Sequence, residues 1–164
     1  MNLTINEQWK GQKFDLQQVV FCPQFFSIED PIDFNRLTSI ADFCESKIID
    51  KKNPTLMKIA EVGEIKDISN VENIIKNLLV DTFKINTYIF ASFNKHGITD
   101  THHDGESVFL IPTYGLVNYI IYEEEKFIKN FQMEKGDLLI IPKKVKHSAI
   151  PLSPRIVVSV GIYN

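Results

Sequence analysis

The pattern of apolar and polar positions divides the chain into two parts that predict different secondary structure. From residue 85 onward, short segments rich in Ile, Val, Phe and Tyr alternate with Gly, Pro, Asn or charged turns, a pattern typical of β-strands. The strands expected there span residues 86–93, 107–112, 116–122, 127–132, 137–142 and 155–163. Many short strands, with one closing the C-terminus, indicate a sandwich or jelly-roll barrel.

The first part, residues 1–84, combines helical and extended patterns. Apolar residues recur near a period of 3.6 in residues 33–49 and 69–84, which predicts two amphipathic helices. Asp30-Pro31 suits the entry to the first helix, and Ser69 or Asn70 can cap the second. Residues 55–65 look extended and hairpin-like. We therefore expect an α+β, mainly β fold with both helices packed on one outer face of the β core.

Length and composition agree with one globular domain spanning residues 1–164. Of these residues, 44% are hydrophobic and 24% charged, and no repeat or linker interrupts them. The net charge of −3 comes without an evident basic face, so we do not expect a nucleic-acid partner.

The two cysteines and the N-terminal sequence indicate the cellular compartment in which the protein is expected. Cys22 and Cys44 are too few for a disulfide framework and form no CxxC pair, which fits a reducing compartment. The N-terminus lacks a signal peptide, and no apolar run is long enough to span a bilayer. We expect a cytoplasmic protein without a membrane partner.

The histidines provide the candidate chemistry, because all four lie in the β half. If residues 102–104 enter a strand, its period of two places His102 and Asp104 on one face and His103 on the other. His147 can supply a third ligand from a distant strand, whereas His96 is expected in a loop.

Two imidazoles and one carboxylate form the facial triad of non-haem Fe(II) sites, which leaves three coordination positions open. A structural zinc site would have four ligands, typically including cysteine, and neither cysteine lies near the cluster in the sequence. A single HxD occurs often by chance. The spacing therefore leaves open a non-enzymatic jelly-roll module whose histidines are incidental.

Two longer motifs bear a family resemblance. Residues 136–147 (GDLLIIPKKVKH) resemble the second cupin motif, although Lys144 stands where a glycine is usual. Residues 102–115 (HHDGESVFLIPTYG) resemble the HxD segment of JmjC-type hydroxylases, with Pro112 where a glutamine is common. The final strand is also similar to that of the family, so the resemblance covers residues 86–164. It implies a cupin-type double-stranded β-helix with Fe(II) on His102, Asp104 and His147, and 2-oxoglutarate as cosubstrate.

The cosubstrate site departs from the family pattern. The Lys or Arg expected two residues after the turn glycine is Val117. Thr99 matches a position that often offers a hydroxyl to the far carboxylate of 2-oxoglutarate. A final-strand arginine has this role in the wider superfamily, and here Arg155 and Ser159 share a face. In the alternative interpretation Arg155 faces solvent, because residues 156, 158, 160 and 162 form the more apolar stripe.

Two functions follow from these motifs. The first is an Fe(II)- and 2-oxoglutarate-dependent oxygenase that hydroxylates a small-molecule or peptide substrate. The second, motivated by Val117, is a metal-binding cupin that has another activity or binds a small ligand without 2-oxoglutarate. The analogy with cupins also suggests a homodimer.

Overall fold

The computed structural model describes residues 1–44, 47–49, 55–60, 62, 65–95, 99–123 and 126–163. Its helical elements are η1 (Glu7–Trp9), α1 (Phe34–Phe43) and α2 (Lys66–Leu78). Its strands are β1 (Asn2–Ile5), β2 (Val20–Cys22), β3 (Phe26–Glu29), β4 (Lys47–Ile49), β5 (Leu56–Ile59), β6 (Lys84–Ser92), β7 (Ser107–Tyr114), β8 (Val117–Glu123), β9 (Lys126–Met133), β10 (Leu138–Ile141), β11 (Lys146–Pro151) and β12 (Arg155–Tyr163). No helix within these residues has both the length and the apolar character needed to cross a bilayer.

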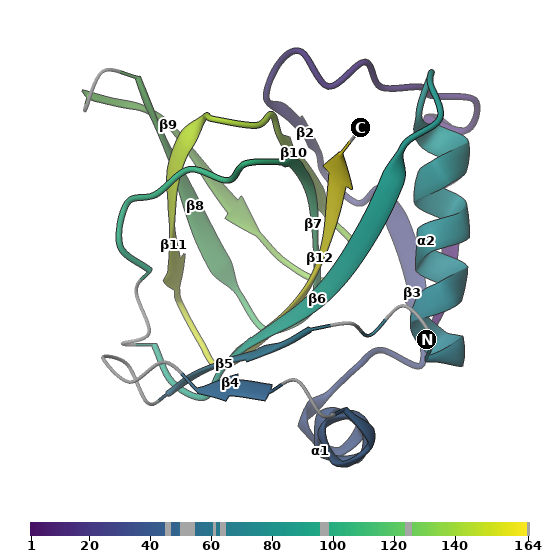
Figure 1. Cartoon of the computed structure of the whole chain (residues 1–164), viewed down its shortest axis with the longest axis vertical. Helices are drawn as coiled ribbons and strands as arrows, with labels where there is room; N and C mark the ends of the chain where they lie inside the picture. Colours follow the sequence, from purple (N-terminus) through teal and green to yellow (C-terminus); the bar gives the residue numbers. More distant parts are fainter. Residues whose placement is uncertain are drawn as a thin grey trace.

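Two antiparallel sheets face each other and form the barrel (Figure 1). The major sheet has the strand order β2-β10-β7-β12-β6-β5-β4, and the minor sheet has the order β11-β8-β9. A separate ribbon pairs β1 with β3. The predicted mainly β jelly roll is confirmed.

The core consists of two apolar layers, one on each face of the major sheet. The outer layer packs the sheet against α1 and α2, and the inner layer fills the space between the sheets. Strand β12 serves both layers: Ile156 and Val158 belong to the outer one and Val157 to the inner one. Side chains on a strand alternate between its faces, so a strand buried on both faces needs apolar residues in both rows.

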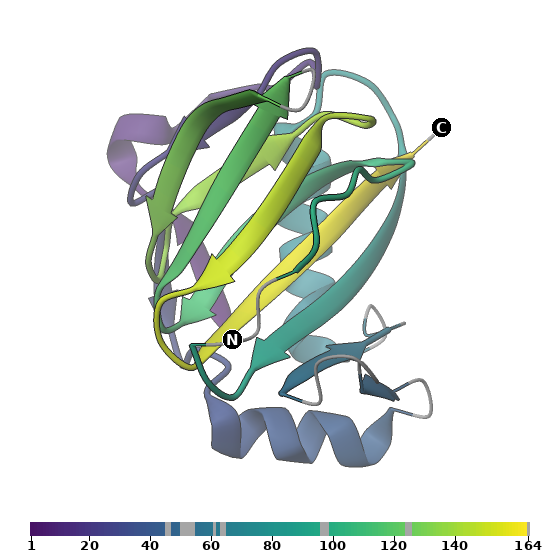
Figure 2. The ribbon, with the colours of Figure 1, turned by 90° about the vertical axis from the view of Figure 1, so that its left-hand side faces the viewer.

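Helix α2 lies on the side of the major sheet away from the minor sheet, and α1 lies at one end of the barrel. Leu37 and Ile40 of α1, and Val71 and Ile75 of α2, are buried in the outer layer. Figure 2 shows α1 crossing one end of the barrel while α2 lies behind the major sheet. This placement closes the outer face and leaves the inner face available for a site.

The first helix is shorter than the sequence predicts. The Asp33 side chain caps its N-terminus by accepting a hydrogen bond from the Arg36 amide at 2.9 Å, and the helix ends at Phe43. Residues 47–49, expected in the helix, form β4 and pair with β5. The sheet edge offers these residues hydrogen-bond partners, so tertiary pairing overrides the helical period.

The second helix is displaced toward the N-terminus of its predicted range. It spans Lys66–Leu78 with Ile65 before it, so Ser69 and Asn70 lie within the helix and do not cap it. At the other end the Phe14 amide donates to the Leu78 carbonyl at 2.9 Å, and Lys13 Nζ donates to the Asn77 carbonyl at 2.5 Å. A distant segment thus satisfies carbonyls that the end of a helix leaves unpaired.

The strands expected in the second half form close to their predicted positions. Those in the first half, β1, β2 and β3, were not predicted. Strand β11 was foreseen only as the distant strand that carries His147. Residues 55–65 contribute β5, but its hairpin partner β4 comes from the segment expected to be helical.

Candidate metal centre

Two segments far apart in the sequence meet at the candidate site. His102 and Asp104 lie in the connection between β6 and β7, and His147 lies on β11. The His102 amide donates to the His147 carbonyl at 3.0 Å, and the His147 amide donates to the His102 carbonyl at 2.8 Å. This reciprocal backbone bridge holds the two histidines side by side.

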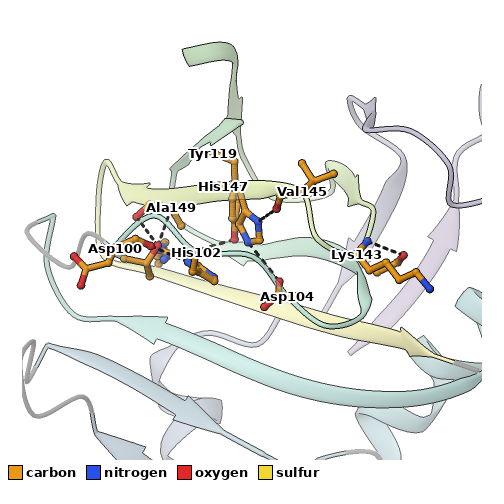
Figure 3. A network of polar contacts seen from close by, with 11 residues as sticks. Asp100, His102, Asp104, Tyr119, Lys143, Val145, His147 and Ala149 are labelled. Atoms are coloured by element: carbon orange, nitrogen blue, oxygen red, sulfur yellow. Dashed lines mark hydrogen bonds and ion pairs between the residues drawn. The ribbon is translucent and has the colours of Figure 1, made fainter. Parts of the chain in front are cut away.

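The three side chains converge on a common point (Figure 3). One ligand atom from each of His102, Asp104 and His147 lies within 4.8 Å of the others. His147 Nε2 is 3.4 Å from Asp104 Oδ2, and the two imidazole ring centroids are 4.5 Å apart. One ion between these atoms would have two nitrogen ligands and one oxygen ligand.

The backbone orients both imidazoles for coordination. Nδ1 of His102 lies 2.8 Å from the Asp100 carbonyl, and Nδ1 of His147 lies 3.0 Å from the Val145 carbonyl. A carbonyl oxygen only accepts, so each Nδ1 carries the proton and donates it to the hydrogen bond. Each Nε2 then keeps its lone pair for a metal, the arrangement in which an outer partner fixes the tautomer of a ligand histidine.

Burial favours the neutral form of His147. Its side chain is 5% exposed, whereas that of Asp104 is 34% exposed. Desolvation lowers the pKa of His147, helped by the charge on His102 and opposed by the hydrogen bond to Val145 and by Asp104. A neutral imidazole is the form that binds metal. Because His147 is already favoured in this form, metal binding has to displace a proton from it less often than from an ordinary histidine.

A cavity of about 90 Å³ contains the three ligand atoms and continues into the barrel. Its walls come from both sheets and from the β6–β7 connection. The lining residues are Lys58, Tyr88, Phe90, Thr99, His102, Asp104, Glu106, Val108, Leu110, Tyr119, His147, Ala149, Arg155 and Ser159.

Arg155 contributes a buried cation to this cavity. It is 2% exposed, and its Nη1 donates to the Tyr119 hydroxyl at 3.4 Å. Its Nε has no hydrogen-bond partner among the described residues. Leaving such a donor unpaired away from water is costly, so the arrangement fits an anionic ligand in the cavity.

The solvent-facing interpretation of Arg155 is therefore wrong. The apolar row of β12, which includes Ile156 and Val158, packs against the helices outside the major sheet. The more polar row, with Arg155 and Ser159, consequently faces the barrel interior and lines the cavity. The apolar stripe marks a covered outer face, which the sequence alone did not reveal.

Comparisons with known proteins place the chain in a family. A profile of the JmjC domain matches residues 64–164. The chain belongs to the JmjC domain family. Among curated protein sequences none matches it.

Solved structures share the fold of this JmjC domain. YcfD, a ribosomal oxygenase from Escherichia coli, superposes in its cobalt and succinic acid complex with a TM-score of 0.74 at 19% identity, over 91% of this chain and 49% of that one. Its complex with cobalt and 2-oxoglutarate gives a TM-score of 0.73 at 18% identity, with the same coverage. Vicilin from Corylus avellana (hazelnut) gives 0.52 at 16% identity, over 72% of this chain and 30% of that one. This chain thus spans about half the length of YcfD.

The remaining predicted residues of the JmjC domain have mixed placements. Thr99 lines the cavity, but its Oγ1 already accepts a 2.8 Å hydrogen bond from the Ala149 amide. Val117 is buried in the apolar layer between the sheets. His103 is exposed, and His96 lies outside the described residues.

Two charged cavity residues, Lys58 and Glu106, were missed as functional candidates, and Tyr119 also lines the cavity. Alternation from His102 and Asp104 could have indicated Glu106, and alternation from Val117 could have indicated Tyr119.

Burial and then the charge on Asp104 raise the pKa of Glu106, while Lys58 acts in the opposite direction. Burial also raises the pKa of Tyr119, against the effect of Arg155. Nothing in the local sequence around Lys58 indicates its place in the site.

Proposed function

We propose that this JmjC domain is an Fe(II)- and 2-oxoglutarate-dependent oxygenase. The observation that carries the proposal is the buried Arg155, whose Nε is unpaired among the described residues, in one cavity with His102, Asp104 and His147. A metal-ligand set and a buried guanidinium in one small cavity match a ligand that chelates metal at one end and carries a carboxylate at the other.

The donor set suits iron. Two imidazole nitrogens and one carboxylate oxygen are the ligands of the facial triad, and they leave adjacent positions open for a chelating cosubstrate and dioxygen. Bound together, Fe(II) and 2-oxoglutarate would activate dioxygen, which is the oxidant, for hydroxylation of a C–H bond. The YcfD structures, which contain cobalt with 2-oxoglutarate or succinic acid, support the same pairing here.

The residues of the chain would divide the remaining tasks. The Asp100 and Val145 carbonyls keep the ligand imidazoles in the metal-binding tautomer. Arg155 would hold the far carboxylate of 2-oxoglutarate, with the Ser159 hydroxyl on the same row of β12 and with Thr99 as a third polar neighbour. Val108 and Leu110 would keep that part of the cavity dry, which strengthens the charge pairing.

Anaerobic addition of Fe(II) and 2-oxoglutarate tests the proposal. The complex should show the weak visible charge-transfer absorption of chelated iron. Arg155→Met should bind metal as the unmodified chain does but weaken 2-oxoglutarate binding at least about thirtyfold, the cost of truncating a buried charge pair. The matched control is Arg36→Met on α1, a residue that does not line the cavity. Iron binding without the absorption band would reject the proposal.

A second function is supported by Val117. An apolar residue is buried where the family usually has a cation, which fits a metal-binding cupin that does not use 2-oxoglutarate. In that case Arg155→Met would leave metal binding and the affinity for the true ligand unchanged. A large loss of 2-oxoglutarate affinity in this variant would exclude the second function.

We also propose a small-molecule or peptide substrate and a cytoplasmic location. Cys22 and Cys44 are both free thiols, which fits a reducing compartment.

A further inference from the structure

The turn that joins β10 to β11, residues 142–145, contacts both of the segments that supply the candidate ligands. The Lys144 amide donates a hydrogen bond to the Asp104 carbonyl at 2.9 Å. The Val145 carbonyl, one residue further along, accepts the hydrogen bond from Nδ1 of His147 at 3.0 Å (Figure 3). A displacement of this turn would therefore shift the Asp104 backbone and release the His147 ring together.

The turn has a backbone conformation that its own residues do not favour. Lys144 has φ +67°, in the left-handed region where a residue with a Cβ is disfavoured. The Val145 amide closes the turn with a long hydrogen bond of 3.3 Å to the Pro142 carbonyl. The Lys144 side chain is exposed, so packing of that side chain does not offset the cost. Contacts from outside the turn must therefore keep it in place.

Ser107 provides such a contact. Its Oγ accepts a hydrogen bond from the Lys143 amide at 3.1 Å. Ser107 is 5% exposed and begins β7, where it pairs with Ile162 of β12. The serine is thus fixed in the major sheet, and its hydroxyl links that sheet to the turn. Together with the contact to Asp104, two hydrogen bonds join the turn to residues 104–107.

The Ser107 side chain does not itself reach the ligand group. Ser107 is not among the residues that line the metal cavity. It lines a neighbouring, larger cavity of about 550 Å³ instead. An influence of the hydroxyl on the metal centre must therefore pass through the turn.

We propose that Ser107 is a positioning residue: its hydroxyl holds the 142–145 turn, and the turn sets the place of Asp104 and the tautomer of His147. The inference rests on the proposed function only in taking these two residues to be metal ligands. The hold on the turn and the tautomer can be measured without metal, so they do not depend on oxygenase chemistry. Because ligands already held in place have less freedom to lose on binding, removal of the hydroxyl should weaken metal binding.

The first test uses NMR on the full chain without metal. In the unmodified chain the Lys144 amide should exchange slowly with solvent, and His147 should carry its proton on Nδ1. Ser107→Ala should speed that exchange about tenfold, the effect of losing one hydrogen bond. It should also give His147 a mixture of both tautomers, seen in the chemical shifts of the ring nitrogens. Ser107→Thr keeps the hydroxyl, and the neighbouring cavity has room for its methyl group, so this variant should behave as the unmodified chain does.

The second test measures the affinity for Co(II) from the visible absorption of the bound ion. Ser107→Ala should lower this affinity about threefold to tenfold, less than the loss of a direct partner of a ligand, and Ser107→Thr should restore it. The matched control is Ser153→Ala. The Ser153 hydroxyl also accepts a hydrogen bond from a turn amide, that of Leu116 at 2.9 Å, but no candidate ligand lies in that turn. This variant should leave the tautomer and the Co(II) affinity unchanged.

Three results would overturn the proposal. The first is rapid exchange of the Lys144 amide in the unmodified chain, which needs no variant. The second is an unchanged tautomer and Co(II) affinity in Ser107→Ala, and the third is an equal loss in Ser107→Ala and Ser153→Ala. Failure of the unmodified chain to bind Co(II) would instead reject the metal site of the proposed function, while the NMR measurements would still decide whether Ser107 holds the turn.

Discussion

At the scale of single residues, the two cysteines have different environments although both are free thiols. Cys22 is 1% exposed on β2, and burial raises the pKa of its thiol to about 11. Cys44 follows α1 and is only partly buried. The thiolate is the reactive form, and at pH 8 a thiol with this pKa is ionised to roughly one part in a thousand.

We expect Ellman's reagent at pH 8 to label Cys44 readily and Cys22 only after unfolding. Absorbance at the start of the reaction should correspond to one thiol per chain, and denaturant should release the second. Cys44→Ser serves as the control, because it should remove the fast phase and leave the slow one. Fast labelling of both thiols in the folded chain would contradict the burial of Cys22.

The convergence of the three candidate ligands could be predicted from the sequence, but the orientation of Arg155 could not. The side chains of His102, Asp104 and His147 have chemistry that restricts their role, and the spacing of the first two places them on one face. For Arg155 the same alternation allows the side chain to face either the barrel interior or the outside, because the sequence does not show which face of β12 the helices cover. Lys58 reaches the cavity only through the pairing of β5 with β6, a contact across distant parts of the chain.

At the scale of elements, a tight turn joins β7 to β8 through Gly115 and Leu116. Gly115 has φ +74°, and a Cβ there would overlap the Pro154 carbonyl. The Ser153 hydroxyl also accepts a hydrogen bond from the Leu116 amide at 2.9 Å. The turn is thus packed against the turn that leads into β12, directly before Arg155.

Gly115→Ala should therefore destabilise the fold more than the left-handed backbone conformation alone requires. Gly11→Ala is the matched control, because Gly11 has φ +80° but open space around its Cβ position. We expect Gly11→Ala to cost about 1 kcal/mol and Gly115→Ala at least about 1 kcal/mol more, measured by urea unfolding. Equal losses in the two variants would show that the close approach to Pro154 does not matter.

Strand positions were predictable because β-branched and aromatic residues concentrate between turn residues after position 85. Helix ends were less so, because they depend on partners elsewhere in the chain. The periodicity of residues 33–49 continues into Ile48 and Ile49, yet these residues pair with Lys58 and Met57 in a sheet. The end of α2 is likewise set by a hydrogen bond from Phe14, more than 60 residues away in the sequence.

At the scale of the whole molecule, the candidate metal centre joins two segments that the backbone already holds together. A metal that binds only the folded chain shifts the unfolding equilibrium, by about 2.7 kcal/mol at a free concentration one hundred times its Kd. We expect Fe(II) or Mn(II) to raise the unfolding temperature in proportion to the logarithm of its concentration. This dependence should vanish in His147→Ala and persist in His103→Ala, since His103 is exposed and outside the ligand group.

For each variant, the melting temperature with metal is compared with the melting temperature of the same variant without metal. A lower stability of metal-free His147→Ala therefore does not affect the comparison. A metal-dependent shift retained in His147→Ala would mean that the ion binds elsewhere.

The two opposite rows of β12 have a consequence for how this protein can change over evolution. Its side chains face the helices and the barrel in strict alternation, with nearly every position buried. Insertion of one residue within β12 would exchange its two rows on one side of the insertion, turning groups of the cavity-facing row toward the helices and branched aliphatic groups toward the cavity. A length change within this strand would disturb both the packing and the site, so we expect β12 to diversify by point substitution and insertions to occur in the turns that flank it.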